Sequence, residues 1–204
     1  LTFFPRVYID KQDPLTAEEN PVLQFEYRHF TKNAKTVAEF SYNQGYKTTG
    51  VKKTPGSRNH LFIDTEIDFK LPDYEYSDLK INIRKTSNDT YLRVHNLFSE
   101  LTKEYNTMHS FANFEFKKKD STLNVRMDSY ENLTAYDNRY EYIFPNFDYF
   151  TNLKYGKYKE DEESKSNLDY QLRSYYKNYN ADADEFILVN DLYYSSDEKI
   201  WNNG

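Results

Sequence analysis

The feature that most constrains this chain is an alternation of apolar and polar side chains at every second position. In Val22–Phe30, Leu23 and Phe25 alternate with Gln24 and Glu26. Successive side chains of a β-strand point to opposite sides, so this period indicates a strand with one apolar and one polar face. Four further segments show the same period: His60–Lys70, Leu79–Arg84, Thr122–Asp128 and Leu168–Arg173.

Weaker strand patterns lie between these segments, and no stretch shows a convincing helical period. The weaker segments are Phe3–Ile9, Thr36–Tyr42, Tyr91–Leu97, Met108–Phe116, Arg139–Tyr149 and Phe186–Tyr194. Together with the five clear segments they predict about eleven strands and an all-β chain. Turn-forming residues separate the strands, at Lys11–Asn20, Gly45–Asn59, Ser87–Asp89, Lys118–Asp120 and Tyr158–Asn167. Strands joined by tight turns are antiparallel, so we expect an up-and-down meander.

One proline interrupts an aromatic strand pattern. Tyr140, Tyr142 and Phe144 precede Pro145, and the phase of the alternation shifts after it. Proline cannot donate to the hydrogen-bond ladder, so we predict a β-bulge at Pro145.

The alternation divides the best strands into two candidate surfaces. A strand with one polar and one apolar face fits both a soluble sandwich and an outer-membrane barrel. Three features favour the barrel: aromatic residues placed as girdles, long and short connections in alternation, and few small residues that could pack a dry core. We therefore expect part of a large transmembrane β-barrel. The predicted lumen-facing residues are Glu26, Arg28, Asp64, Glu66, Asn82, Arg84, Arg126 and Asp128. The predicted lipid-facing residues are Leu23, Phe25, Leu61, Ile63, Leu79, Ile81, Ile83, Leu123, Val125 and Met127.

Tyrosines near predicted strand ends fit the same interpretation. An apolar ring with a polar tip suits the membrane–water interface, although tyrosine also suits strands and sugar-binding surfaces in general. We predict interfacial girdles from Tyr140, Tyr142, Tyr149, Tyr175, Tyr176, Tyr179, Tyr193 and Tyr194.

Composition narrows the possible classes. The 204 residues carry a net charge of −6, without a block of Lys and Arg, which argues against a nucleic-acid partner. No cysteine is present, which excludes disulfides and thiolate metal sites. The longest apolar runs, such as Phe186–Val189, are far shorter than the roughly 20 residues of a membrane-spanning helix. Since the sequence opens on Leu1 without signal-peptide features, we expect residues 1–204 to be one segment inside a longer protein.

The histidines and the clustered carboxylates of the sequence do not indicate a catalytic site. The histidines His29, His60, His95 and His109 stand on separate predicted strands without metal-ligand spacing. Asp64, Glu66 and Asp68 share a strand face, but many other charges flank them and no enclosing pocket can be argued. We expect no enzyme, no catalytic residue, no metal and no cofactor.

Eight stretches, spread over almost the whole chain, invite comparison with a known family: Leu1–Arg6 (LTFFPR), Leu23–Arg28 (LQFEYR), Ala38–Asn43, Ser57–Phe62, Ser87–Val94, Tyr130–Thr134, Arg139–Pro145 and Val189–Ser196. In this order they resemble the barrel of the LptD family, also called OstA or Imp, which assembles lipopolysaccharide in the outer membrane.

The resemblance implies an interior arc of a barrel that delivers lipopolysaccharide to the outer leaflet of a Gram-negative outer membrane. It further implies transport without catalysis, with outer-membrane lipid, a luminal LptE-like lipoprotein and a periplasmic Lpt bridge as partners. The periplasmic jelly-roll domain, the terminal gate strands and the cysteines of that family find no match in these residues. The alternative is a soluble β-rich module that binds glycans through exposed tyrosines, which would need a dry core within this chain.

Overall fold

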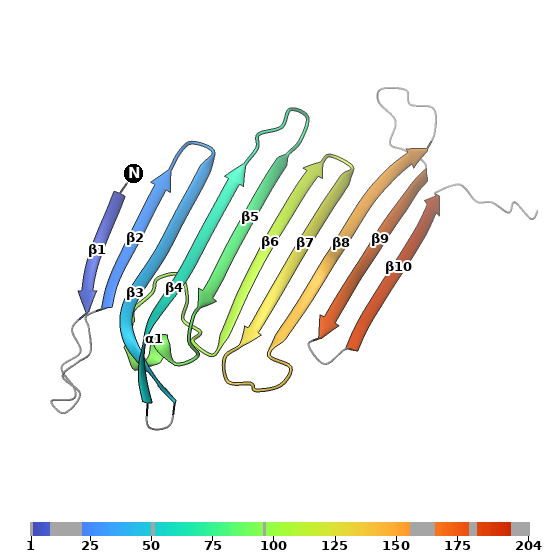
Figure 1. The fold of residues 1–204 in the computed structure, drawn as a ribbon. Helices are drawn as coiled ribbons and strands as arrows, with labels where there is room; N and C mark the ends of the chain where they lie inside the picture. Colours follow the sequence, from blue (N-terminus) through green and yellow to red (C-terminus); the bar gives the residue numbers. More distant parts are fainter. Residues whose placement is uncertain are drawn as a thin grey trace, which may run out of the picture.

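The computed structural model describes residues 2–8, 22–49, 52–95, 97–155, 166–179 and 183–196. In these ranges the chain forms one antiparallel sheet of ten strands in the order of the sequence, β1 to β10 (Figure 1). The strands are β1 (Thr2–Tyr8), β2 (Val22–Phe30), β3 (Ala34–Thr49), β4 (Lys52–Asp68), β5 (Tyr76–Thr86), β6 (Thr107–Lys118), β7 (Ser121–Asn132), β8 (Tyr140–Tyr155), β9 (Ser166–Tyr179) and β10 (Ala183–Ser196). The predicted all-β antiparallel meander is confirmed.

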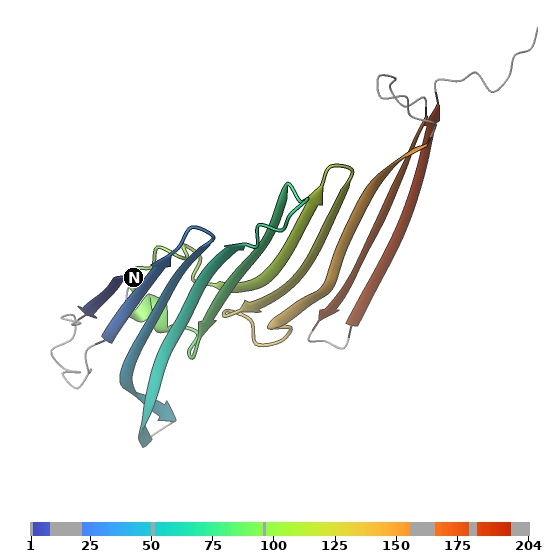
Figure 2. The ribbon, with the colours of Figure 1, turned by 90° about the horizontal axis from the view of Figure 1, so that it is seen from above.

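The sheet is open and twisted. Seen from above, β1 and β10 lie at opposite ends of the sheet and do not meet (Figure 2). Strands β1 to β7 pair in continuous registers, for example β3 with β4 from Ala34 opposite Ile67 to Thr49 opposite Lys52. The sheet does not close, so the closed barrel expected from the sequence belongs to the proposals below.

The predicted strand Tyr91–Leu97 is wrong. A short helix, α1 (Tyr91–Val94), begins there and the chain continues as irregular structure. The Asn88 side chain accepts hydrogen bonds from the backbone N–H of Thr90, at 3.1 Å, and from the Thr90 hydroxyl, at 2.9 Å, which turns the chain before the helix. Tyr91 and Leu92 are neighbours and both are buried, which an alternating strand on one face of a sheet does not allow.

The predicted connection Gly45–Asn59 is also largely wrong. Strand β3 continues to Thr49 and β4 begins at Lys52, with Gly45 opposite Gly56 and Tyr46 opposite Pro55. Cross-strand pairing satisfies the backbone groups here, and it overrides the weak turn preference of glycine, serine and asparagine. The predicted connection Lys11–Asn20, and most of Tyr158–Asn167, lie outside the described residues.

The predicted bulge at Pro145 is confirmed. Arg126 of β7 pairs with Asn146 of β8 and Asp128 pairs with Ile143, so β8 carries one more residue than β7 over this interval. The register between β8 and β9 shifts over the same residues, between Ile143 and Asn146. The extra residue explains the phase shift in the aromatic pattern.

The hydrophobic core is small. Its buried members in the described residues are Val22, Phe62, Tyr91, Leu92, Leu97, Met108 and Leu133. Three of them belong to the connection between β5 and β6, residues 87–106, so a folded loop rather than a second sheet supplies the packing. We call residues 87–106 the cover segment.

Candidate functional site

The strand registers assign each predicted site residue to one of two faces. Residues directly opposite one another on neighbouring strands point to the same side of a sheet. One row runs across six strands, through Arg28, Val37, Asp64, Asn82, Phe111 and Asp128. Neighbouring rows place Glu26 with Arg84, and Glu66 with Arg126, on that same side. All eight residues predicted to face a lumen therefore share one surface, which we call the polar face.

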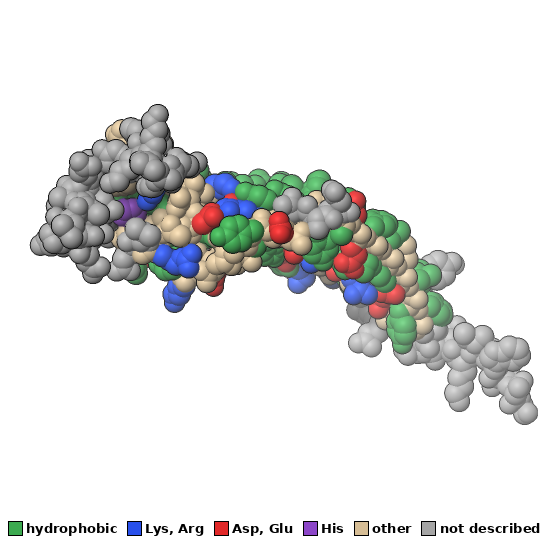
Figure 3. All heavy atoms as spheres, turned by 60° about the horizontal axis from the view of Figure 1, so that its bottom comes forward, with side chains coloured by type: hydrophobic (Ala, Val, Ile, Leu, Met, Phe, Trp, Pro, Cys, Tyr) green, Lys and Arg blue, Asp and Glu red, His purple; other side chains and the backbone are tan. Residues whose placement is uncertain are grey.

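The ten residues predicted to face lipid lie on the opposite surface, which we call the apolar face. Phe25 and Leu61 share one row, Ile63 and Ile83 a second, and Ile81 and Met127 a third. Leu79 and Val125 occupy the next row, Leu123 lies opposite Phe116, and Leu23 lies opposite Tyr42. In Figure 3 hydrophobic side chains reach the surface along much of the described sheet.

At several positions the burial of the two faces is inverted relative to a soluble protein. In β2 the side chains of Gln24 and Glu26 are 0% and 1% exposed, whereas the neighbouring side chain of Leu23 is 38% exposed. In β7 Asp128 is 6% exposed and its neighbour Met127 is 38% exposed. Polar groups removed from water need partners, so the polar face must be matched by other polar groups of the chain.

The cover segment supplies part of these partners. Gln24 Nε2 donates to the Phe98 carbonyl at 3.1 Å, and Arg84 Nη2 donates to the Leu101 carbonyl at 2.7 Å. The Glu100 backbone N–H donates to Glu39 Oε1 at 3.2 Å, and Arg28 Nη2 meets the Glu100 carboxylate at 2.7 Å. The backbone of the loop thus lies against β2, β3 and β5, with its carbonyls and N–H groups turned toward the sheet.

Ion pairs connect the remaining charges of the polar face. Glu26 accepts from both Arg6, at 3.0 Å, and Arg28, and Arg84 meets Asp64 at 2.7 Å. Farther along the sheet Asp128 accepts from Arg126 at 2.8 Å and lies 2.7 Å from His109 Nε2. Arg126 also lies over the Phe111 ring, 4.3 Å from its centroid. The face is therefore a network of paired charges with few apolar members.

A buried serine, histidine and tyrosine join the cover segment to the sheet. Ser41 Oγ lies 2.5 Å from His60 Nδ1 and 2.9 Å from the Tyr91 hydroxyl, and His60 packs against the Phe62 ring at 4.5 Å between centroids. Burial raises the pKa of the Tyr91 hydroxyl. Ser41, His60 and Tyr91 are each no more than 1% exposed, so a substrate has no path to the serine. We assign them to holding the cover segment in place.

A second contact joins the start of the cover segment to the turn between β7 and β8. Arg139 donates to both Asp89 oxygens, at 3.0 and 2.6 Å, and to Glu131 Oε1 at 3.0 Å. Lys85 and the Tyr140 hydroxyl also bind the Glu131 carboxylate, at 2.5 and 3.0 Å. The hydrogen bonds from Arg139 lower the pKa of the Asp89 carboxyl, and those to Asp89 and Glu131 raise the pKa of Arg139.

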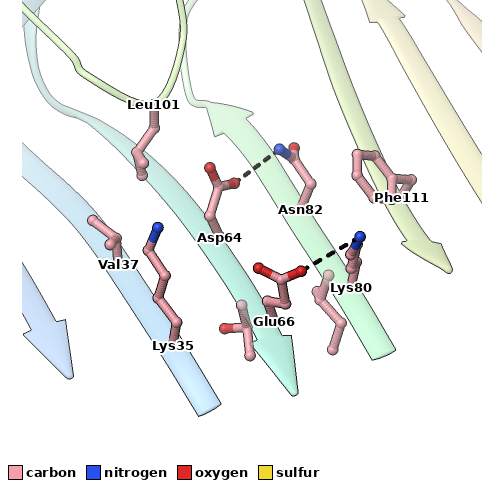
Figure 4. A pocket seen from close by; sticks show the side chains of 10 residues that line it. Lys35, Val37, Asp64, Glu66, Lys80, Asn82, Leu101 and Phe111 are labelled. Atoms are coloured by element: carbon pink, nitrogen blue, oxygen red, sulfur yellow. Dashed lines mark hydrogen bonds and ion pairs between the residues drawn. The ribbon is translucent and has the colours of Figure 1, made fainter. Parts of the chain in front are cut away.

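An open pocket of about 270 Å³ lies on the polar face beside the cover segment (Figure 4). Asp64 accepts from Asn82 Nδ2 at 2.8 Å and Glu66 lies 3.4 Å from Lys80, while Leu101 of the cover segment points toward the pocket from above. The side-chain oxygen of Asn82, Oδ1, is buried and has no hydrogen-bond partner within the described part of the chain. The pocket offers both charges and one aromatic side chain, Phe111, to a polar ligand.

The sequence interpretation missed the residues that hold the cover segment. Glu39 and Tyr91 are buried on or against the polar face, but neither was predicted there. Glu39 had a usable signal, because the alternation of Thr36–Tyr42 places it beside Glu26 once β2 and β3 are paired. Tyr91 had none, because its contact with Ser41 joins residues 50 positions apart.

The predicted tyrosine girdles are divided between the faces. Tyr140, Tyr142 and Tyr149 lie opposite Glu131, Ser129 and Leu123, on the apolar face. Tyr176 and Tyr194 lie there too, opposite Phe186 and Leu168, whereas Tyr175, Tyr179 and Tyr193 share rows with Asn146, Glu141 and Asp169 on the polar face. For three of the eight tyrosines the girdle prediction is therefore wrong about the face. It considered how near each tyrosine lies to a strand end, but not to which face the alternation turns its side chain.

The described residues contain neither a helix of the length and apolarity needed to cross a bilayer nor a group of three His, Asp or Glu side chains suited to a metal ion. No family model, curated protein or solved structure matches the chain.

Proposed function

We propose that this chain is an arc of an outer-membrane β-barrel that takes part in placing lipopolysaccharide in the outer leaflet of a Gram-negative envelope. The observation that carries the membrane part of the proposal is the inverted sheet. A loop of the same chain covers part of its polar face, over Gln24, Glu39 and Arg84. Large side chains of its apolar face are 38–41% exposed, namely Leu23, Phe40, Leu61 and Met127. A bilayer stabilises such a face, whereas water does not.

The height of the apolar face supports the same proposal. On β6 and β7 the face ends at one side near Met108, opposite Glu131 with its cationic partners, and at the other side at Lys118. The residues from Met108 to Lys118 span about 34 Å along the strand at roughly 3.4 Å per residue. A strand tilt of about 40° converts this to about 26 Å along the membrane normal, near the apolar band of about 25 Å in outer-membrane barrels.

A soluble glycan-binding module is disfavoured by the same geometry. It requires a dry core, but the buried hydrophobic cluster of the described residues has only seven members, and large side chains of the apolar face stay exposed. Large hydrophobic residues such as Phe40 and Leu61 are 41% and 39% exposed on that face. A contiguous exposed apolar surface of this kind marks contact with lipid or another macromolecule.

The lipopolysaccharide part of the proposal rests on the resemblance to the LptD family. In that interpretation the polar face lines the lumen, where the cover segment leaves the pocket near Asn82 open. An LptE-like lipoprotein would share this lumen, and the periplasmic Lpt bridge would deliver the lipid. The chain contributes transport and no catalysis, at the outer membrane.

Solubility tests the membrane part. We expect the 204-residue chain to aggregate in buffer and to become monodisperse with strand-type far-UV circular dichroism in mild detergent, because detergent covers the apolar face. Sedimentation in both conditions measures this. A monodisperse monomer in buffer with fixed near-UV tyrosine signals would establish the soluble module instead.

Depletion in the source bacterium tests the lipopolysaccharide part. We expect newly made lipopolysaccharide to disappear from the cell surface when the protein containing this chain is depleted, and to return when the intact gene is restored. The readout is surface labelling with a reagent that does not cross the outer membrane. If surface lipopolysaccharide persists after the protein is gone, the transport role is wrong even where the membrane location holds.

A further inference from the structure

An aromatic and cationic cluster lies at one border of the apolar face, at the turns that join β4 to β5 and β6 to β7. We call Phe69, Tyr74, Phe116 and Lys118 the rim cluster. The rings of Phe69 and Phe116 stack at 6.4 Å with 9° between their planes, and Tyr74 meets Phe116 edge-on at 6.1 Å. Lys118 Nζ lies 5.9 Å from the centroid of the Tyr74 ring. Both turns lie at the upper end of the sheet in Figure 1.

The rim cluster packs tightly on the sheet and still reaches the surface. Ser77 lies opposite Phe116 on β5 and is 1% exposed, and its hydroxyl accepts a hydrogen bond from the backbone N–H of Leu71 at 3.1 Å. Phe69 and Tyr74 are 41% and 42% exposed, and so is Leu71 of the same turn, at 41%. An aromatic group that is fixed on one side and exposed on the other is suited to contact something outside the chain.

Side-chain chemistry changes in order along the apolar face toward this border. The row of Ile81, Ala112 and Met127 is followed by a mixed row of Leu79, Phe114, Val125 and Phe147, and then by the row of Phe116, Leu123 and Tyr149. Lys118 comes last, opposite Ser121. Rows two residues apart along a strand are separated by about 7 Å. Aliphatic, aromatic and cationic side chains thus follow one another over the distance in which a bilayer changes from acyl chains to headgroups.

The charges at this border leave Lys118 available to an anion. Lys117 pairs with Glu75 at 2.9 Å and Lys70 with Asp68 at 3.7 Å. Lys118 has no ion pair within the described ranges, and its ammonium group rests over Tyr74. A cation on an aromatic ring beside an apolar surface suits the phosphate of a lipid headgroup, since the acyl chains can lie on the apolar side.

We propose that the rim cluster lies in the headgroup layer of the bilayer and that Lys118 binds the phosphate of an anionic glycerophospholipid such as phosphatidylglycerol. This inference rests on the proposed membrane location and adds to it the depth at which the barrel wall meets the headgroups. Ile81 then lies among the acyl chains, and Leu71 at the interface.

Depth-dependent quenching tests the placement, and the absence of native cysteine allows single labels in this chain. Leu71→Cys, Ile81→Cys and Asn82→Cys variants of the 204-residue chain carry an environment-sensitive fluorophore and are reconstituted in phosphatidylcholine vesicles. We expect the residue-71 label to be quenched by headgroup spin labels, the residue-81 label by spin labels deep in the acyl chains, and the residue-82 label by neither.

The outcomes separate the two proposals. If residue 81 is quenched by deep labels while residue 71 is quenched by neither kind, the rim cluster lies outside the bilayer and this inference is wrong, although the membrane location stands. If residue 81 is not quenched at all, the proposed membrane location is wrong.

A charge variant tests the role of Lys118. With the residue-71 label, brominated phosphatidylglycerol should quench more strongly than brominated phosphatidylcholine. We expect Lys118→Gln to lower the apparent preference for phosphatidylglycerol about five-fold, as one lysine near an anionic surface contributes. Lys80→Gln is the matched control, because Lys80 is an exposed lysine of the polar face paired with Glu66. An unchanged preference in Lys118→Gln, or an equal loss in Lys80→Gln, would refute phosphate binding by Lys118.

Discussion

Neighbouring residues of one strand have opposite environments in this sheet, and β5 offers the clearest pair. Ile81 shares its row with Ala112 and Met127, whereas Asn82 shares its row with Asp64 and Phe111. Asn82 donates to Asp64 at 2.8 Å and lines the open pocket. A single step along the backbone therefore exchanges an apolar surface for a charged one.

Arginine substitutions at these two positions should differ in cost. In the protein folded into a bilayer, we expect Ile81→Arg to reduce the free energy of unfolding by about 2–4 kcal/mol, because the guanidinium enters the lipid. Asn82→Arg should cost little, since Asp64 can accept from the new side chain. Urea unfolding in vesicles measures both. Equal costs at the two positions would contradict the assignment of the faces to lipid and lumen.

The Asp89–Arg139 contact belongs to the scale of elements, because it joins the start of the cover segment to the β7–β8 turn. The pKa of the Asp89 carboxyl is lowered by hydrogen bonds from Arg139. A carboxyl whose pKa is lower in the folded than in the unfolded protein stabilises the fold above its usual pKa of about 4, and the contribution is lost as the pH falls through the lower value.

Acid should therefore loosen the start of the cover segment. We expect hydrogen exchange at residues 88–92 to accelerate when the pH is lowered from 6 to below the pKa of Asp89, after correction for the intrinsic rates. Asp89→Asn should show fast exchange already at pH 6. Asp137→Asn, at an exposed position in the β7–β8 turn, is the control and should behave like the unchanged chain. A pH response that survives in Asp89→Asn would rule out this carboxyl as its origin.

The cover segment is held by apolar burial as well as by polar contacts. Leu97 is 2% exposed within the hydrophobic core, while the next residue, Phe98, is 57% exposed. We expect Leu97→Ala to cost about 2–5 kcal/mol, as for other leucines deleted from a packed core, and Phe98→Ala to cost less than about 0.5 kcal/mol. Hydrogen exchange of the backbone N–H of Glu100, which donates to Glu39, reports the release of the segment. Similar exchange in both variants would mean that polar contacts alone hold it.

At the scale of the whole molecule, the outer strands β1 and β10 each have one edge without a partner strand among the described residues. Strand β10 is the longer, and Leu188, Leu192 and Tyr193 on it are 56%, 69% and 66% exposed. An unpaired edge with exposed apolar side chains is a site for pairing with another strand. In a complete barrel the neighbouring strands would occupy both edges.

Edge pairing should make the isolated chain associate in detergent. We expect Leu192→Lys to lower the fraction of dimers and larger species in sedimentation velocity, because a charge on an edge strand opposes pairing. Leu153→Lys is the matched control: it replaces a leucine that is 51% exposed on the same face, but within β8, which is paired on both sides. Equal effects of the two substitutions would show that association runs through the apolar face.

Features set by neighbouring residues of one strand were predicted correctly, whereas features set by contacts between residues far apart in the sequence were not. The boundaries of β2 were predicted to the residue, and the division of eighteen site residues between two faces agrees with the registers, because both depend on side-chain period along one strand. The segment Tyr91–Leu97 was predicted as a strand because its local pattern does not reveal that Tyr91 packs on His60 and Ser41.

By itself, the sequence determined that this chain forms an antiparallel meander with one polar and one apolar face, since alternation is a property of the extended backbone and tight connections force antiparallel neighbours. Only the tertiary structure decided which polar side chains are buried. The cover segment returns to β2, β3 and β5 and brings partners to Gln24, Glu39 and Arg84. Such contacts join residues distant in the chain, and their free energy depends on geometry that no local pattern records.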